Sequence, residues 1–163
     1  MKVDVLILMG SESDAPIMSA ARDTVTEFGL TCEMTVASAH RSPARVLRLV
    51  NEALSRGVKV FIVGAGAAAH LAGVVAAHTT LPVIGVPIDS SALKGMDALL
   101  STVQMPPGVP VATVAIGKAG AINAGVLAAQ MIALGDPSLA DRLVEYKAKL
   151  AEKVEEAAKR LGT

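Results

Sequence analysis

The stretch VDVLILMGSESDAP, residues 3–16, decides the fold class of this chain. Val3–Met9 is short, apolar and rich in branched side chains, which is typical of a strand that is buried on both faces. The next five residues are small or polar and predict a loop. A helix is expected after them, with Ser13 or Asp14 as its N-cap. Strand, loop and helix in this order form the repeating unit of α/β proteins.

The same order recurs along the rest of the chain. Further strands are predicted at Thr31–Ala37, Val58–Val63, Pro82–Val86 and Val109–Ala115, and helices at about 43–56, 70–78, 93–101 and 119–134. Such nearly continuous apolar strands predict a parallel, doubly wound sheet that helices cover on both faces. We therefore expect one domain over 1–163, with a core at about 3–134. Ligands bind these sheets beyond the carboxyl ends of the strands, where the loops at 10–14, 38–42, 64–70 and 87–92 should meet.

Composition excludes several classes of protein. The chain has 163 residues, a formal net charge of zero and only three aromatic side chains, so it offers neither a basic patch nor a stacking platform for nucleic acid. Its longest apolar runs are too short to span a bilayer, and its first residues do not resemble a signal peptide. Cys32 is the only cysteine, which is typical of a reducing compartment. We expect a cytoplasmic protein that binds neither nucleic acid nor a membrane.

The loop at 10–14 is suited to an anion. It leads into a helix N-terminus, whose free N–H groups and partial positive charge bind phosphate, and the Ser11 and Ser13 hydroxyls add donors. Asp14 would repel a phosphate and suits a ribose hydroxyl instead. The alternative is that Ser13 and Asp14 only cap the helix, and spacing alone leaves both interpretations open.

The loop Ser38–Pro43 is more informative. Arg41 stands at a predicted helix start, where the helix dipole disfavours a cation unless an anion is bound. His40, beside it, is the residue type whose ordinary pKa lies nearest neutrality. A solvated arginine and a hydrogen-bonded loop histidine are the alternative to an anion site with an acid–base group.

The loop Gly64–His70 allows three interpretations. It matches a dinucleotide fingerprint, but no acidic residue ends the next strand at the usual distance. It could serve close packing of a helix on a strand, or it could line an apolar pocket for a small neutral molecule. A metal site is not expected, because His70 and His78 would lie about 12 Å apart along a helix. Lys118, at the start of the fifth helix, could face the site or the solvent.

Four motifs in this order resemble the N5-carboxyaminoimidazole ribonucleotide mutase family of purine biosynthesis. They are Gly10-Ser11-x-Ser13-Asp14, Ser38-Ala39-His40-Arg41-x-Pro43, Gly64-Ala65-Gly66-x-Ala68-Ala69-His70-Leu71 and Val103-Gln104-Met105-Pro106-x-Gly108-Val109-Pro110-Val111. The resemblance covers about 3–134. Ser42 stands where the family often has threonine, and Asp89 replaces a more usual glutamine or other polar residue. A related branch carboxylates aminoimidazole ribonucleotide directly with carbon dioxide and differs in two of these loops.

The resemblance implies a flavodoxin-like three-layer sandwich with a central parallel sheet, a homo-octamer with sites near subunit boundaries, and no metal or cofactor. It implies that His40 is the acid–base residue. It further implies a substrate site made by Ser11, Ser13, Asp14, Ser38, Ala39, Arg41, Gly66, His70 and Leu71. A functional link to an ATP-dependent carboxyaminoimidazole ribonucleotide synthetase is a further expectation.

The residues are compatible with that chemistry. The carboxylate moves from the exocyclic nitrogen to ring carbon C4 by loss and recapture of carbon dioxide, while one proton moves from C4 to nitrogen. A single histidine can exchange that proton, and a pocket walled by alanine and glycine can hold neutral carbon dioxide. Direct carboxylation by carbon dioxide is the first alternative. A phosphosugar-binding or flavin-binding module without enzymatic activity is the second, although flavin usually stacks on loop aromatics, which are absent here.

The helix expected at about 137–161 differs from the others. Its apolar residues recur every three or four positions and form one stripe, Leu139, Leu143, Tyr146, Leu150, Val154, Ala157 and Leu161. Charged residues occupy its other faces. The stripe can pack on its own domain or on a neighbouring subunit, and the sequence leaves the two open.

Overall fold

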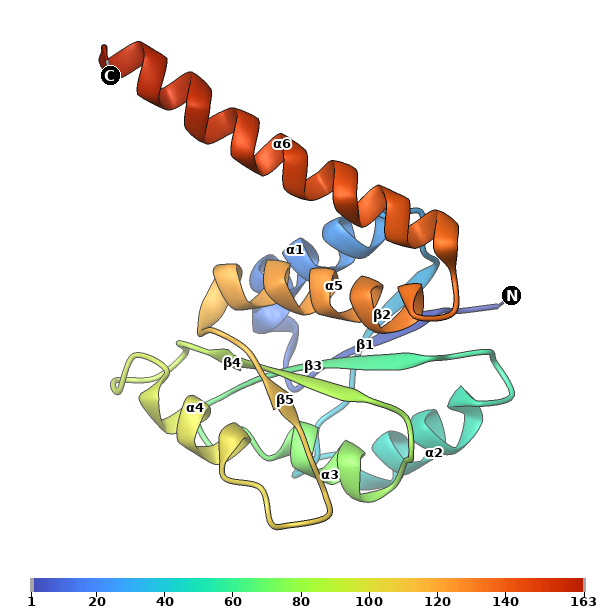
Figure 1. Ribbon diagram of the computed structural model, residues 1–163. Helices are drawn as coiled ribbons and strands as arrows, with labels where there is room; N and C mark the ends of the chain where they lie inside the picture. Colours follow the sequence, from blue (N-terminus) through green and yellow to red (C-terminus); the bar gives the residue numbers. More distant parts are fainter. Residues whose placement is uncertain (1, 163) are drawn as a thin grey trace.

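A computed structural model describes residues 2–162 as a three-layer α/β sandwich (Figure 1). Five parallel strands form its central sheet in the order β2-β1-β3-β4-β5, which is the flavodoxin-like order. The strands are β1 (Val5–Met9), β2 (Cys32–Val36), β3 (Val60–Gly66), β4 (Val83–Ile88) and β5 (Ala112–Thr113). The helices are α1 (Ala15–Glu27), α2 (Pro43–Ala53), α3 (Leu71–Ala77), α4 (Met96–Val103), α5 (Gly117–Ala133) and α6 (Pro137–Leu161), and a 3-10 turn, η1 (Glu12–Asp14), precedes α1. The predicted fold class is confirmed.

The alternation of side chains along the strands divides the core into two layers. Val5 and Ile7 of β1 pack under α1 and α5, whereas Leu6 and Leu8 pack against α2 and α3 on the other face. Figure 1 shows α1, α5 and α6 on one side of the sheet and α2, α3 and α4 on the other. Because both faces are covered, the polar loops are left at the carboxyl ends of the strands, where the site was predicted.

All five strands lie where they were predicted, but β3 and β5 differ most in their bounds. β3 continues through Gly64–Gly66, which were expected to form a loop, because these residues pair with Val86–Ile88 of β4. β5 is limited to Ala112–Thr113 rather than seven residues. Pro110 has no N–H to offer a ladder, and this strand lies at the edge of the sheet, where pairing is available on one side only.

Helix α6 begins on its own domain and then leaves it. Asp136 caps it by accepting a hydrogen bond from the Leu139 N–H. Leu139 is buried, and the Tyr146 ring packs on Phe28 with ring centroids 5.1 Å apart. Beyond this point the helix projects away from the sandwich (Figure 1), and Leu150, Val154 and Leu161 are 45%, 67% and 83% exposed. The first half of the stripe therefore packs on its own domain, while the second half is uncovered in the single chain.

Candidate active site

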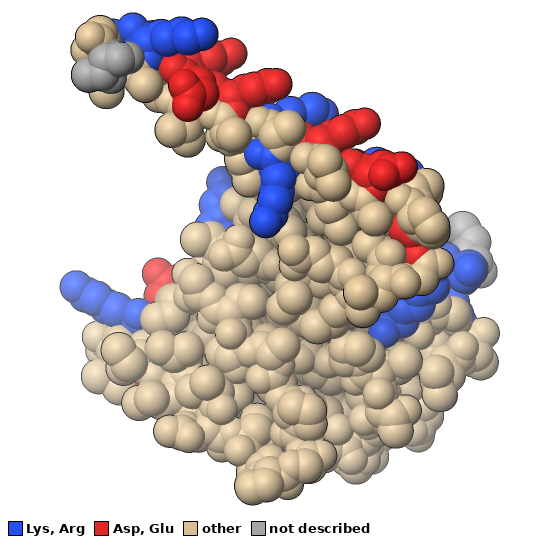
Figure 2. Space-filling view, viewed as in Figure 1, with Lys and Arg blue, Asp and Glu red and all other residues tan. Residues whose placement is uncertain are grey.

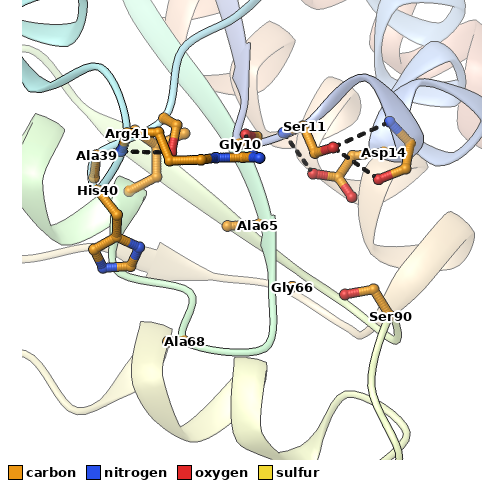
Figure 3. Close-up of a pocket in the computed structure, with 13 residues that line it drawn as sticks. Gly10, Ser11, Asp14, Ala39, His40, Arg41, Ala65, Gly66, Ala68 and Ser90 are labelled. Carbon is orange, nitrogen blue, oxygen red and sulfur yellow. Dashed lines mark hydrogen bonds between the residues drawn. The ribbon is translucent and has the colours of Figure 1, made fainter.

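A cavity of about 280 Å³ lies beyond the carboxyl ends of β1, β2 and β3. The four loops that were expected to converge each contribute to it. Its lining residues are Gly10, Ser11, Ser13, Asp14, Ser38, Ala39, His40, Arg41, Ala65, Gly66, Ala68, Leu71 and Ser90 (Figure 3). Every predicted site residue except His70 is in this set, and His70 contacts it through His40.

The first loop is closed by its own side chains. The Ser11 hydroxyl accepts a hydrogen bond from the Ser13 N–H, and the Asp14 carboxylate accepts one from the Ser11 N–H at 3.1 Å. Asp14 precedes α1, as predicted, but its side chain makes no cap bond to that helix. Ser11, rather than Ser13 or Asp14, is the side-chain cap, and it caps the 3-10 turn η1. These bonds fix the hydroxyls and the carboxylate at the cavity wall (Figure 3).

Asp14 is the one charged side chain among residues 2–162 that is buried, at 4% exposed. Its burial raises the pKa of the carboxyl group, while the Ser11 N–H and the positive charge of Arg41 act to lower it. A buried carboxylate retained beside an arginine in a cavity is characteristic of a functional site rather than of a surface cap.

The second loop is held by two serines. The Ser42 hydroxyl accepts from the Ser38 N–H at 3.0 Å and donates to the Ser38 carbonyl at 3.2 Å, and the Ser38 hydroxyl accepts from the Arg41 N–H. His40 lies inside this closed turn. Ser42 thus keeps the hydroxyl function that threonine would supply at the same position.

Arg41 and His40 leave the turn in different directions. Arg41 extends across the cavity toward the first loop and donates from Nη2 to the Gly10 carbonyl (Figure 3). The His40 ring lines the cavity, and its Nε2 lies 2.9 Å from Nδ1 of His70. The two rings meet edge to face, with an interplanar angle of 81°. Thirty residues separate these histidines, and no sequence pattern predicted their contact.

Four lining residues were not selected from the sequence: Gly10, Ala65, Ala68 and Ser90. Ser90 follows β4 in a loop that was expected to reach the site. Its hydroxyl makes no hydrogen bond to any part of residues 2–162, and it faces the cavity (Figure 3). A Cβ placed on Gly66 would lie 1.8 Å from this hydroxyl, so the glycine makes room for the serine.

The residues that line the cavity include neither a cluster of metal ligands nor a Phe, Tyr or Trp ring on which a flavin could stack. Across residues 2–162, no three His, Cys, Asp or Glu side chains are grouped closely enough to hold a metal ion. None of the three aromatic residues lines the cavity, since Phe28 and Phe61 are buried in the core and Tyr146 lies on α6. Asp89 and Lys118 are exposed and outside the lining set, near the start of α5. No helix within residues 2–162 has the length and apolar character needed to cross a membrane.

Several known proteins are similar to this chain over nearly its whole length. A protein of Brucella melitensis, named N5-carboxyaminoimidazole ribonucleotide mutase, is 52% identical over 96% of this chain and 96% of its own. Proteins of the same name from Bacillus subtilis and Thermotoga maritima are 53% and 51% identical, each over 95% of this chain and over 96% and 90% of their own lengths.

The fold and the family follow from two further matches. The crystal structure of Treponema denticola PurE superimposes with a TM-score of 0.87 and 30% identity, covering 98% of this chain and 99% of that one. The model of the family described as AIR carboxylase matches residues 4–153. Because the family model matches residues 4–153, and because about half of all residues are identical in these relatives, this chain belongs to the AIR carboxylase family.

Proposed function

We propose that this protein interconverts N5-carboxyaminoimidazole ribonucleotide and 4-carboxy-5-aminoimidazole ribonucleotide in purine biosynthesis, as an isomerase that moves a carboxyl group within one molecule. The observation that carries the proposal is the meeting of His40, Arg41 and Asp14 at one cavity. Relatives that share half of the sequence bear the mutase name, which favours the mutase over the direct carboxylase.

The ribose phosphate is proposed to lie between the first two loops. Arg41 supplies the cation, and the Ser11 hydroxyl, to which the Ser13 hydroxyl donates, supplies a further donor at the same wall. A carboxylate and a phosphate repel each other, so Asp14 is not proposed to contact the phosphate. Its carboxylate is proposed to accept a hydrogen bond from a ribose hydroxyl. Ser38, Ala39, Gly66 and Leu71 then surround the imidazole ring.

His40 is proposed to exchange the proton. As the carbamate C–N bond breaks, carbon dioxide leaves and the exocyclic nitrogen takes a proton from His40. C4 then attacks carbon dioxide, and the new C–C bond makes the C4 proton acidic because its loss restores the aromatic ring. His40 takes that proton, so each turnover returns it to its starting state. The uncharged Ala65, Gly66 and Ala68 are proposed to hold carbon dioxide near C4 and away from water.

The test of this function is a direct assay with N5-carboxyaminoimidazole ribonucleotide, the carbamate nucleotide. The wild-type protein should form the C4-carboxylated product without ATP or added metal. His40→Asn should abolish turnover while largely preserving binding, and His78→Asn is the matched control, because His78 lies at the end of α3, outside the cavity lining. A His40→Asn variant with normal turnover would rule out His40 as the proton carrier. A phosphosugar-binding module would bind the nucleotide and convert none, and a flavin carrier would be yellow.

We propose that the protein assembles into a homo-oligomer, most simply the family's octamer. Two surfaces support this proposal, the exposed apolar patch at α4 and the outer half of α6. Between 60 and 135 only four residues are charged, Asp89, Lys94, Asp97 and Lys118. On the face shown in Figure 2, charged side chains are concentrated on α6, and the middle of the body below it carries none. Four apolar side chains of α4 and the loop before it are also exposed, Leu93, Met96, Leu100 and Val103. One small domain leaves this apolar area uncovered, and a neighbouring copy would bury it together with the outer half of α6.

A cytoplasmic location and a functional link to an ATP-dependent synthetase complete the proposal. Forming the N-carboxyl bond of the carbamate substrate from bicarbonate requires an activated carboxyl group, so the supplying enzyme is expected to consume a nucleoside triphosphate. The free thiol of Cys32 fits a reducing compartment.

A further inference from the structure

The contact between His40 and His70 joins two side chains whose backbones are held differently. His70 sits directly before α3, between the buried residues Ala69 and Leu71, and its N–H donates to the Ala68 carbonyl. Its backbone position is therefore set by the core. His40 lies in the exposed turn between β2 and α2, which is held by the hydrogen bonds of Ser38, Arg41 and Ser42 rather than by burial in the core. The fixed member of the pair is His70, and the member that its contact orients is His40.

The chemistry of imidazole restricts how this contact is made. A neutral imidazole has one N–H and one nitrogen lone pair, so the 2.9 Å contact between His40 Nε2 and His70 Nδ1 contains one proton. If His70 donated that proton, His40 would carry its own proton on Nδ1 and would have no lone pair for a substrate. If His40 donates from Nε2, the lone pair of His40 is on Nδ1, the nitrogen that the contact leaves free.

We propose that His70 is a positioning residue, which accepts a hydrogen bond from His40 Nε2–H and thereby keeps Nδ1 of His40 as the nitrogen that exchanges the proton with substrate. The inference rests on the proposed function. When His40 is an imidazolium, Nε2–H still donates to His70, and Nδ1–H gives its proton to the substrate nitrogen. When His40 is neutral, the same bond holds the ring so that the Nδ1 lone pair faces C4. His70 itself neither gains nor loses a proton.

Amide side chains test this arrangement because they reproduce one imidazole nitrogen each. The oxygen of asparagine is bonded to Cγ, as Nδ1 is, so His70→Asn should retain the acceptor and keep kcat within about 3-fold of wild type. The amide of glutamine lies one bond farther out, near the place of Nε2, so His70→Gln should behave like His70→Leu. Both should lower kcat by about 10- to 100-fold, the loss typical when the partner that orients a functional histidine is removed. KM should stay within about 3-fold, since His70 does not line the cavity.

Nitrogen-15 NMR of the histidines gives a readout without turnover. The chain has only three histidines, and His78→Asn removes the third set of signals. At a pH where both rings are neutral, the expected spectrum has a bridging proton on His40 Nε2, coupled across the hydrogen bond to His70 Nδ1, and it loses this proton in His70→Leu. A bridging proton on His70 Nδ1, or none at all, would overturn the proposal, as would a His70→Leu variant with wild-type kcat. If the wild-type protein failed to convert the carbamate nucleotide, the proposed function would fall, whereas the spectrum would still decide which histidine donates.

Discussion

The guanidinium of Arg41 donates a hydrogen bond from Nη2 to the main-chain oxygen of Gly10, 3.1 Å away. This bond ties the loop after β2 to the loop after β1 and leaves the other N–H donors of Arg41 free for a phosphate. Arg41→Ala should therefore weaken nucleotide binding by about 1.5–3 kcal/mol, the range for hydrogen bonds to charged groups. Isothermal titration with the nucleotide and with the unphosphorylated nucleoside measures it. Arg48→Ala, at an exposed position on α2, is the control. An equal loss for both ligands would mean that Arg41 does not hold the phosphate.

Ser90 and Gly66 should act as one unit. We expect the Ser90 hydroxyl to bond to substrate, because it faces the cavity and has no partner within residues 2–162, so Ser90→Ala should raise KM about 3- to 10-fold. Gly66→Ala should do more damage, because its Cβ would lie 1.8 Å from the Ser90 hydroxyl oxygen and displace it. The double variant Gly66→Ala/Ser90→Gly removes that clash and should match Ser90→Gly alone. Steady-state kinetics on Gly66→Ala, Ser90→Gly and the double variant forms a double-mutant cycle, and purely additive losses would show that the two residues are independent.

Asp14 should make stability depend on pH. Its pKa is raised in the folded state by burial, so between its ordinary value of 3.8 and the raised value the folded protein binds more protons than the unfolded one. Its contribution to the unfolding free energy is therefore greatest at low pH and falls as pH rises through the folded pKa. Asn has no ionisable group, so the Asp14→Asn variant lacks this pH-dependent loss of stability. The Tm of the variant minus the Tm of the wild type should therefore increase from pH 4 to pH 7. A constant difference in Tm across that range would contradict the raised pKa. Nucleotide binding by the variant should be weaker at every pH.

The outer half of α6 should hold subunits together. Light scattering should give the wild-type protein a mass several times that of the 16.6 kDa chain, and eight times for the octamer. Leu150→Glu/Val154→Glu places two charges on the exposed stripe and should shift the protein to smaller species. Ala151→Glu adds a charge at an exposed position off the stripe and should not. A wild-type monomer at micromolar concentration would contradict the proposed assembly.

Most of the site could be predicted because strand ends are easy to locate in this sequence. Apolar runs such as Val3–Met9 stop abruptly at polar loops, and parallel strands bring those loops to one edge. Gly64–Gly66 looked like a loop because glycine is rare in strands, and only pairing with β4 makes them strand. Ser90 has no local feature that distinguishes it from Ser91. Only the structure identifies Ser90 as a site residue, because its hydroxyl occupies the space that a Cβ on Gly66 would fill.

The remaining differences come from contacts between distant residues. The histidine pair depends on how α3 is placed against the loop after β2, which spacing along the chain does not encode. The periodicity of α6 predicts an apolar stripe along the helix, but it does not predict how much of that stripe the rest of the domain covers. In the structure that surface ends near Tyr146, where the ring meets Phe28.

The fate of the carboxyl carbon tests the mutase most directly. Carbon dioxide held beside C4 by Ala65, Gly66 and Ala68 has a high effective concentration there, whereas escaped carbon dioxide is hydrated and diluted. Carbamate nucleotide labelled at its carboxyl carbon is converted by the wild-type protein in excess unlabelled bicarbonate, and the label in the C4-carboxylated product is counted. Most of the label should be retained, and larger side chains at Ala68 should lower both the retention and the rate. Complete loss of label from the wild-type product would mean that free carbon dioxide is the substrate, and that the protein is a direct carboxylase.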